Sequence, residues 1–214
     1  IRRMVCCLTT KNYNQLFLTT IRALDSDGEV TASGLANFLK SSSGDSVRFP
    51  DDEEFNEAFL HNPLYQRLAK YKVRAVLAAI DLALYERKSE QVPLPNNLTI
   101  EHILPVKWQE HWDIPVDIKQ SPEHKLEFIN QRNQILHSLG NLTLITDSLN
   151  PSLSHGSWHK KRPELVKYSK LNLNRYFHFP TDQKNNDPLA EWNEATIALR
   201  ADEMVAIARV IWGY

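Results

Sequence analysis

The stretch 99–161 constrains the fold of this chain more than any other part of its sequence. It begins with a β-branched run that carries an acid and a histidine side by side, Glu101 and His102, and that stops at Pro105. A second run, 139–146, alternates apolar and polar residues and contains a Gly-Asn pair near its start. Both patterns are typical of short strands. We therefore expect a small β component whose strands hold an acid, a histidine and amide side chains.

Most of the remaining sequence has helical periodicity. Apolar residues recur at positions i, i+3, i+4 and i+7 in 64–88 and lie on one face of 191–212. The same reasoning predicts shorter helices over 11–24, 31–39, 51–60, 122–136 and 157–169. The sequence therefore predicts a mainly α fold, with a helical N-terminal region, two strands separated by an insertion and followed by a helix, and a closing helix.

A composition break divides the chain in two. The run Pro93-Leu94-Pro95-Asn96-Asn97 ends the longest helical pattern and leads into the first strand. We expect residues 1–95 to form a helical region that links to an upstream domain. Residues 96–214 would then form a second domain, which holds the strands and the closing helix.

Composition limits the classes of function. The 214 residues are 42% hydrophobic, enough to bury a real core. A net charge of −1 gives no global basic field, so contact with nucleic acid would need a local patch. No apolar run approaches the roughly 20 residues of a membrane span. The adjacent Cys6 and Cys7 have no CxxC partner, which argues against a zinc knuckle and a disulfide framework and fits a reducing cytoplasm.

Four motifs in this order resemble the DUF1524 family of HNH (His-Me finger) endonucleases, which includes restriction enzymes of the GmrSD type. They are Ile100–Pro105, Leu139–Leu144, Leu149–Ser154 and Trp158–Arg162. The resemblance implies a ββα-metal core, DNA as substrate and a place in a modification-dependent restriction or phage-defence protein. It also implies a nucleotide-hydrolysing DUF262 domain upstream in the same polypeptide, which fits a chain that starts at Ile1 rather than Met.

The resemblance and the chemistry of phosphodiester hydrolysis assign roles to these residues. His102 would be the general base that deprotonates water, and Glu101 would be a ligand of Mg²⁺ or Mn²⁺. Asn150 would be a second metal ligand, whereas Asn141, nine residues earlier as in related HNH domains, would hold the loop that orients His102. Adjacent side chains of a regular strand point to opposite sides, so a bend or bulge near Pro105 would be needed to bring both to one site.

Three further residues are expected near phosphate. Lys160 and Lys161 lie in the helical motif, and His155 stands where the family often has asparagine. His155 is open to three interpretations: a metal ligand, a phosphate contact or a tolerated variant. Of the other histidines, His137 and His159 are the best placed to line the site. Zinc is the weaker choice of metal, because no Cys or His pair has ligand spacing.

Each motif also has a purely structural interpretation. A Glu-His pair in a strand is usually a surface pair, Gly-Asn is usually a turn, and Lys-Lys-Arg is usually a solvated helix face. The combination in this order favours a metal-dependent DNA endonuclease domain. The alternative is a catalytically inactive member that keeps the fold as a nucleic-acid-binding or docking module. The intact set of Glu101, His102 and Asn150 favours the enzyme.

Overall fold

A computed structural model of the chain describes residues 1–26, 28, 30–85, 92–178 and 187–213. They form two compact units, which divide between residues 58 and 59. Both units are mainly helical, and the second contains one small sheet, so the mainly α fold with a small β component is confirmed. The functional division at residues 95 and 96 stays a prediction. Within the described residues, no helix is both long enough and apolar enough to cross a membrane.

The first unit is helical, as its sequence pattern predicts. It contains α1 (Arg2–Val5), α2 (Tyr13–Ser26), α3 (Ala32–Ser41) and most of α4 (Asp52–His61). Thr31 caps α3 by accepting the backbone N–H of Gly34 at 3.0 Å. Three acids in the first turn of α4 face the positive end of its dipole. The helices predicted over 11–24, 31–39 and 51–60 are confirmed, with ends that shift by one or two residues.

The second unit is organised around an antiparallel pair of strands. Strand β1 (Leu98–His102) pairs with β2 (Leu142–Thr146) in a regular register, with His102 opposite Leu142. The insertion between them contains η1 (Trp108–Glu110), α7 (Val116–Lys119), α8 (Pro122–Ile135) and η2 (Leu139–Asn141). Both strands and the long insertion helix lie where the sequence predicts them.

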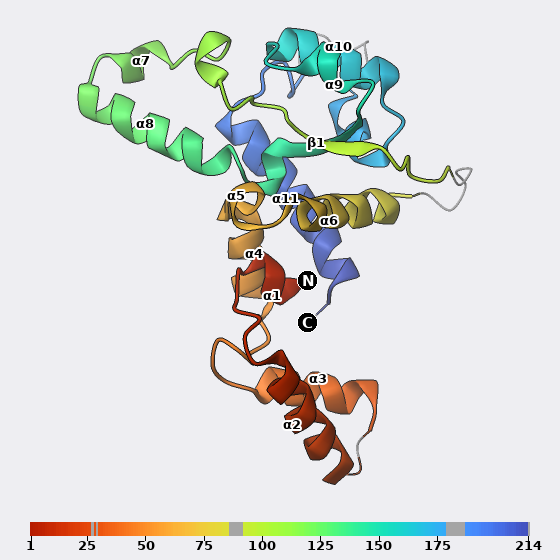
Figure 1. The fold of residues 1–214 in the computed structure, drawn as a ribbon. Helices are drawn as coiled ribbons and strands as arrows, with labels where there is room; N and C mark the ends of the chain where they lie inside the picture. Colours follow the sequence, from red (N-terminus) through yellow and green to blue (C-terminus); the bar gives the residue numbers. More distant parts are fainter. Residues whose placement is uncertain (27, 29, 86–91, 179–186, 214) are drawn as a thin grey trace. The chain divides into compact units, whose positions relative to one another are not determined.

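Helices cover both faces of this two-stranded sheet. Helix α6 (Lys70–Ala83) contacts both strands, whereas η3 (Asn172–Phe177) contacts β2 and also α10 (Trp158–Tyr168). Figure 1 shows α6 on one side of β1, with α10 and the short α9 (Asn150–Leu153) on the other. Because successive side chains of a strand alternate between faces, neighbouring residues of β1 contact different helices. The order of two strands and a following helix is present, and the metal core stays a prediction.

The closing helix, α11 (Glu194–Ile211), packs against η2 and α6. It begins with a capping box between Asn193 and Thr196. The predicted apolar face is buried at Ile197, Ala201, Met204, Val205 and Ala208. Contact with η2 is close because Gly140 has no side chain. A Cβ at that position would lie 2.5 Å from the carbonyl oxygen of Ile197.

The prediction of a single helix over 64–88 is wrong. The chain forms α5 (Leu64–Arg67) and then α6, separated by extended backbone at Leu68 and Ala69, with ψ of 152° and 140°. A tertiary contact fixes the start of α5, since the backbone N–H of Tyr65, in its first turn, donates to the carbonyl of His137. Apolar periodicity carries no information about such a contact. The predicted end at residue 88 lies outside the described residues.

Candidate active site

Asn141 holds the backbone that follows His102. Its Oδ1 accepts the backbone N–H of Leu104 at 2.8 Å, and its Nδ2 donates to the carbonyls of Leu104 and Leu136, both at 2.9 Å. The carbonyl of Asn141 accepts the N–H of Ile103 at 3.0 Å. The side chain is fully buried, so these bonds have no competition from water. These are the backbone contacts expected of the residue that orients His102.

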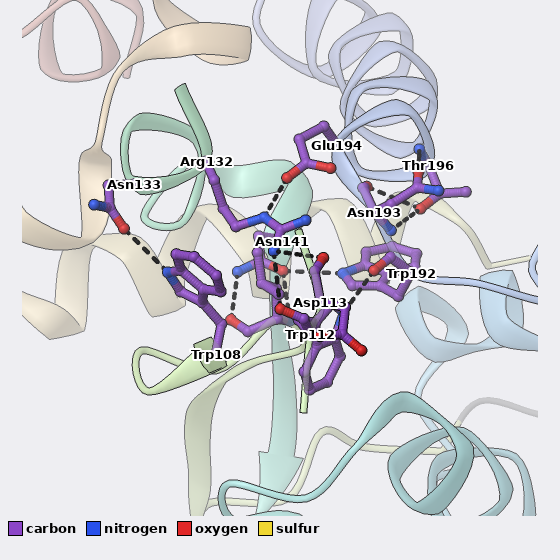
Figure 2. A network of polar contacts seen from close by, with 11 residues as sticks. Trp108, Trp112, Asp113, Arg132, Asn133, Asn141, Trp192, Asn193, Glu194 and Thr196 are labelled. Atoms are coloured by element: carbon purple, nitrogen blue, oxygen red, sulfur yellow. Dashed lines mark hydrogen bonds and ion pairs between the residues drawn. The ribbon is translucent and has the colours of Figure 1, made fainter. Parts of the chain in front are cut away.

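The side-chain oxygen of Asn141 has a second donor, which links it to distant segments (Figure 2). Trp192 donates its indole N–H to this oxygen at 3.0 Å, and the carbonyl of Trp192 accepts the indole N–H of Trp112 at 2.7 Å. Arg132 donates to the carbonyl of Trp112 at 3.2 Å and forms an ion pair with Glu194. The insertion and the start of α11 are therefore joined through Asn141.

Arg200, on α11, fixes the same segment from the other side. Its Nη1 donates to the carbonyls of Gly140 and Leu142, each at 2.8 Å. These two carbonyls flank Asn141 in the chain. The sequence contained a signal for this role, since Arg200 shares the buried face of the predicted helix with Ile197 and Ala201. No spacing rule pointed to Trp192.

The imidazole of His102 is buried in a small cluster of rings. Its Nε2 lies 3.0 Å from Nδ1 of His137, and its centroid lies 4.4 Å from that of Tyr65, edge to face. Burial lowers the pKa of His102 to about 3, and the positive charges of His137, Lys161 and Lys70 act in the same direction. The ring is therefore neutral at neutral pH, which is the form that accepts a proton.

Glu101 forms a buried ion pair with Lys161 of α10. The ammonium nitrogen of Lys161 lies 2.5 Å from Oε1 of Glu101 and donates to the carbonyl of His102 at 2.6 Å. Burial raises the pKa of Glu101 and lowers that of Lys161, whereas their mutual attraction opposes both shifts. Lys161 is fully buried, so a phosphate contact for Lys161 does not fit this geometry. Its spacing from Trp158 and Leu165, which are also buried, contained the signal for this.

The structure separates the side chains of Glu101 and His102. The pairing of β1 with β2 continues without a bulge through His102, so the two side chains leave the strand on opposite faces. Glu101 points to Lys161, and His102 points to the rings of Tyr65 and His137. The bend expected at Pro105 lies beyond the paired residues. The backbone does bend, at Ile103 and Leu104, but only after both side chains have left the strand.

The remaining candidates occupy the segment of α9 and α10. Asn150 is the first residue of α9 and is half-buried, while His155 and Lys160 are exposed. The charge of His155 is among the influences that oppose the rise in the pKa of Glu101. His159 is exposed and lines a hollow with Trp192, so it does not join His102. His137 does, as expected.

A metal ion would find few protein ligands here. Within the described ranges, no three His, Cys, Asp or Glu side chains are grouped so that they could hold a metal. The oxygen donors predicted from the sequence, Glu101 and Asn150, are of the type that Mg²⁺ and Mn²⁺ prefer. Mg²⁺ commonly keeps several waters and binds through one or two protein ligands together with substrate phosphate. The donor types therefore fit such an ion, although they do not form a complete protein cage.

One comparison with known proteins gives a match. A family model described as the C-terminal domain of GmrSD restriction endonucleases matches residues 49–207, a span that includes both strands, the insertion and every candidate site residue. No curated protein and no solved structure matches the chain.

Proposed function

Because this chain belongs to the family of GmrSD restriction endonuclease C-terminal domains, we propose that it is a metal-dependent DNA endonuclease of the HNH type. The observation that carries the proposal is the set of hydrogen bonds by which the side chain of Asn141 holds the backbone of Leu104, two residues after His102. A general base must be held in place to act efficiently, and Asn141 supports the residue best suited to be that base.

In this proposal His102 accepts the proton of the attacking water. Its Nε2 is engaged by His137, so Nδ1 would be the atom that takes the proton. Positioned proton transfer of this kind contributes roughly 10²–10⁴-fold to a rate. The divalent ion, Mg²⁺ or Mn²⁺, would supply charge stabilisation at the phosphate oxygens. Glu101 and Asn150 would be its ligands, which requires the carboxylate of Glu101 to leave Lys161 and to reach the side of β1 on which His102 lies. The exposed Lys160 and His155 would contact phosphate.

We place the choice of DNA target in an upstream DUF262-type domain of the same polypeptide. The net charge of −1 gives this chain no overall basic field to support tight sequence-specific binding. The nuclease unit would then cut with little preference, and the upstream domain would restrict it to modified or phage DNA in the cytoplasm. This arrangement predicts that the chain alone cleaves ordinary and modified DNA at similar low rates.

The buried pair of Glu101 and Lys161 favours a second candidate. A lysine that neutralises the carboxylate weakens its attraction for a metal cation, because the ammonium group repels the cation. The chain would then be a catalytically inactive member that keeps the fold to bind nucleic acid or to dock another domain.

Plasmid nicking distinguishes the two candidates. Wild-type protein should nick supercoiled DNA with Mg²⁺ or Mn²⁺ and not with EDTA. His102→Ala should abolish nicking, and Asn141→Ala should reduce it through loss of loop order. His124→Ala, an exposed histidine on α8, is the matched control and should remain active. Full activity of His102→Ala would exclude His102 as the base, and DNA binding without any cleavage by the wild type would favour the inactive module.

A further inference from the structure

A cavity of about 240 Å³ lies beside Arg200, between the end of α6, η3 and α11. Its lining combines apolar side chains with polar ones. The polar members are Asn172, Arg175, Tyr176, Arg200 and Glu203, and the apolar members are Leu84, Leu173, Met204 and Ile207. None of the candidate residues for phosphodiester hydrolysis lines it.

The guanidinium of Arg200 is only half satisfied. The Nη1 nitrogen is fully hydrogen-bonded, since it donates to the carbonyls of Gly140 and Leu142. Its Nη2 has no hydrogen-bond partner in the part of the chain that the structure describes, although the residue is only 1% exposed. The rings of Tyr176 and Phe177 lie 5.7 and 5.0 Å from the guanidinium carbon and offer cation–π contact alone. A buried, positively charged donor is therefore left with one nitrogen unbonded, and the carboxylate of Glu203, three residues further along α11, is a negative charge that acts on it.

Such a group is costly to bury. A charge removed from water needs both hydrogen bonds and a compensating charge, and burial already lowers the pKa of Arg200 to about 10. Water in the cavity would satisfy the free N–H, but the lining would keep a net positive charge, since Arg175 and Arg200 face the single carboxylate of Glu203. A volume of about 240 Å³ is large enough for several water molecules. A tetrahedral oxyanion fits in that space, and the planar guanidinium fork suits its oxygens.

We propose that this cavity binds a small oxyanion of the size of phosphate, with Nη2 of Arg200 as its buried donor. The exposed Arg175 adds a second positive charge to the lining, and the exposed Glu203 opposes binding. Because Nη1 of Arg200 holds the two carbonyls that flank Asn141, the anion would also stabilise η2. The proposal does not depend on the nuclease activity.

The test measures binding of inorganic phosphate by calorimetry and by the rise in Tm, against chloride at equal ionic strength. We expect a saturable rise in Tm for the wild type. Glu203→Gln should tighten binding about fivefold and Arg175→Gln should weaken it about fivefold, as expected for one exposed charge interaction. Asp202→Asn, an exposed neighbour outside the lining, is the matched control and should leave the Kd unchanged. Arg200 itself is kept, because its loss would also free two buried carbonyls.

A second arm separates the sources of the anion. Binding of inorganic phosphate but not AMP supports a free oxyanion, whereas binding of AMP with the same dependence on Glu203 supports the phosphate group of a nucleotide. Two results would overturn the proposal. One is a Tm that phosphate does not raise above its value in chloride, since water alone would then fill the cavity. The other is a rise that neither Glu203→Gln nor Arg175→Gln alters, since the anion would then bind elsewhere.

Discussion

Trp192 donates its indole N–H to the side-chain oxygen of Asn141, 51 positions earlier in the chain, at 3.0 Å. This bond determines which way the amide of Asn141 faces. With the oxygen toward Trp192 and the N–H of Leu104, the amide nitrogen is left to bind the two carbonyls of Leu104 and Leu136. In a flipped amide, the amide nitrogen would face the N–H groups of Trp192 and Leu104, so donors would face donors. Trp192 therefore positions Asn141, which in turn holds the segment after His102.

We predict that Trp192→Phe reduces the nicking rate roughly 10–100-fold, the usual loss when a residue that orients a site is removed. Trp158→Phe is the matched control, because Trp158 is a buried indole that donates to the carbonyl of Leu189 at 2.8 Å and does not touch Asn141. Each variant should lose about 0.5–1.5 kcal/mol of unfolding free energy for one hydrogen bond. Equal losses of activity in both variants would show general destabilisation instead of a positioning role.

The burial of His102 predicts a loss of stability in acid. The folded pKa of about 3 lies below the ordinary value of 6.5, so the unfolded chain binds the proton first as the pH falls. The contribution of neutral, buried His102 to the unfolding free energy is complete above pH 6.5. It is lost progressively as the pH falls toward about 3, by up to about 1.4 kcal/mol per pH unit. The unfolding free energy, measured with urea between pH 7 and pH 4, should fall less steeply with decreasing pH in His102→Gln than in the wild type.

The neighbouring His137 limits the size of that effect. Its pKa is also lowered by burial, so the unfolding free energy of His102→Gln should still fall in acid, although less steeply than that of the wild type. His124→Gln, on the exposed side of α8, should have the wild-type slope. Identical slopes for His102→Gln and the wild type would mean that His102 is not buried as described.

Two adjacent lysines should behave differently. Lys160 is exposed, so Lys160→Ala should leave the unfolding free energy within about 0.5 kcal/mol of the wild type and lower the slope of log K against log salt by about 0.9. Lys161→Met should instead cost about 3–5 kcal/mol, because it leaves the buried carboxylate of Glu101 without its partner. DNA binding over a range of salt and urea unfolding measure the two effects. A large fall in salt dependence with unchanged stability for Lys161→Met would contradict the burial of Lys161.

Close packing at Gly140 gives a further prediction. An added Cβ would lie 2.5 Å from the carbonyl oxygen of Ile197 and 2.8 Å from Cβ of Ala201, so Gly140→Ala should force α11 outward. We expect a loss of about 1–3 kcal/mol of unfolding free energy, as for other overpacked cores. Gly213→Ala is the matched control, since its nearest contact would be 3.8 Å away. An unchanged stability of Gly140→Ala would show that α11 does not pack this closely.

Local patterns in the sequence predicted the elements well. The strands at 98–102 and 142–146 follow from short β-branched and alternating runs, and the helices follow from apolar periodicity and turn residues. The contacts of Asn141 with the backbone were also expected, from the resemblance of the motifs. In each case the signal lies within a few residues of the element that it predicts.

What the sequence did not predict depends on contacts between distant segments. The partnership of Glu101 with Lys161 joins residues 60 positions apart. His137 was expected to line the site, but its direct contact with the ring of His102, 35 positions earlier, was not. Apolar patterns describe which face is buried and do not say which charged side chain is buried with it. The strand pleat that separates Glu101 from His102 was foreseeable, and the chain bends only after His102, at Ile103 and Leu104, so the two side chains stay on opposite faces.

The bonds from Arg200 to the carbonyls on either side of Asn141 have a consequence for synthesis on the ribosome. The first of these carbonyls belongs to Gly140, 60 positions before Arg200, so at about 5–20 residues per second the interval between their synthesis is roughly 3–12 s. Throughout that interval the strands and His102 exist without the helix that holds them in place. A nascent chain therefore acquires the final arrangement of its candidate site only when α11 has been made.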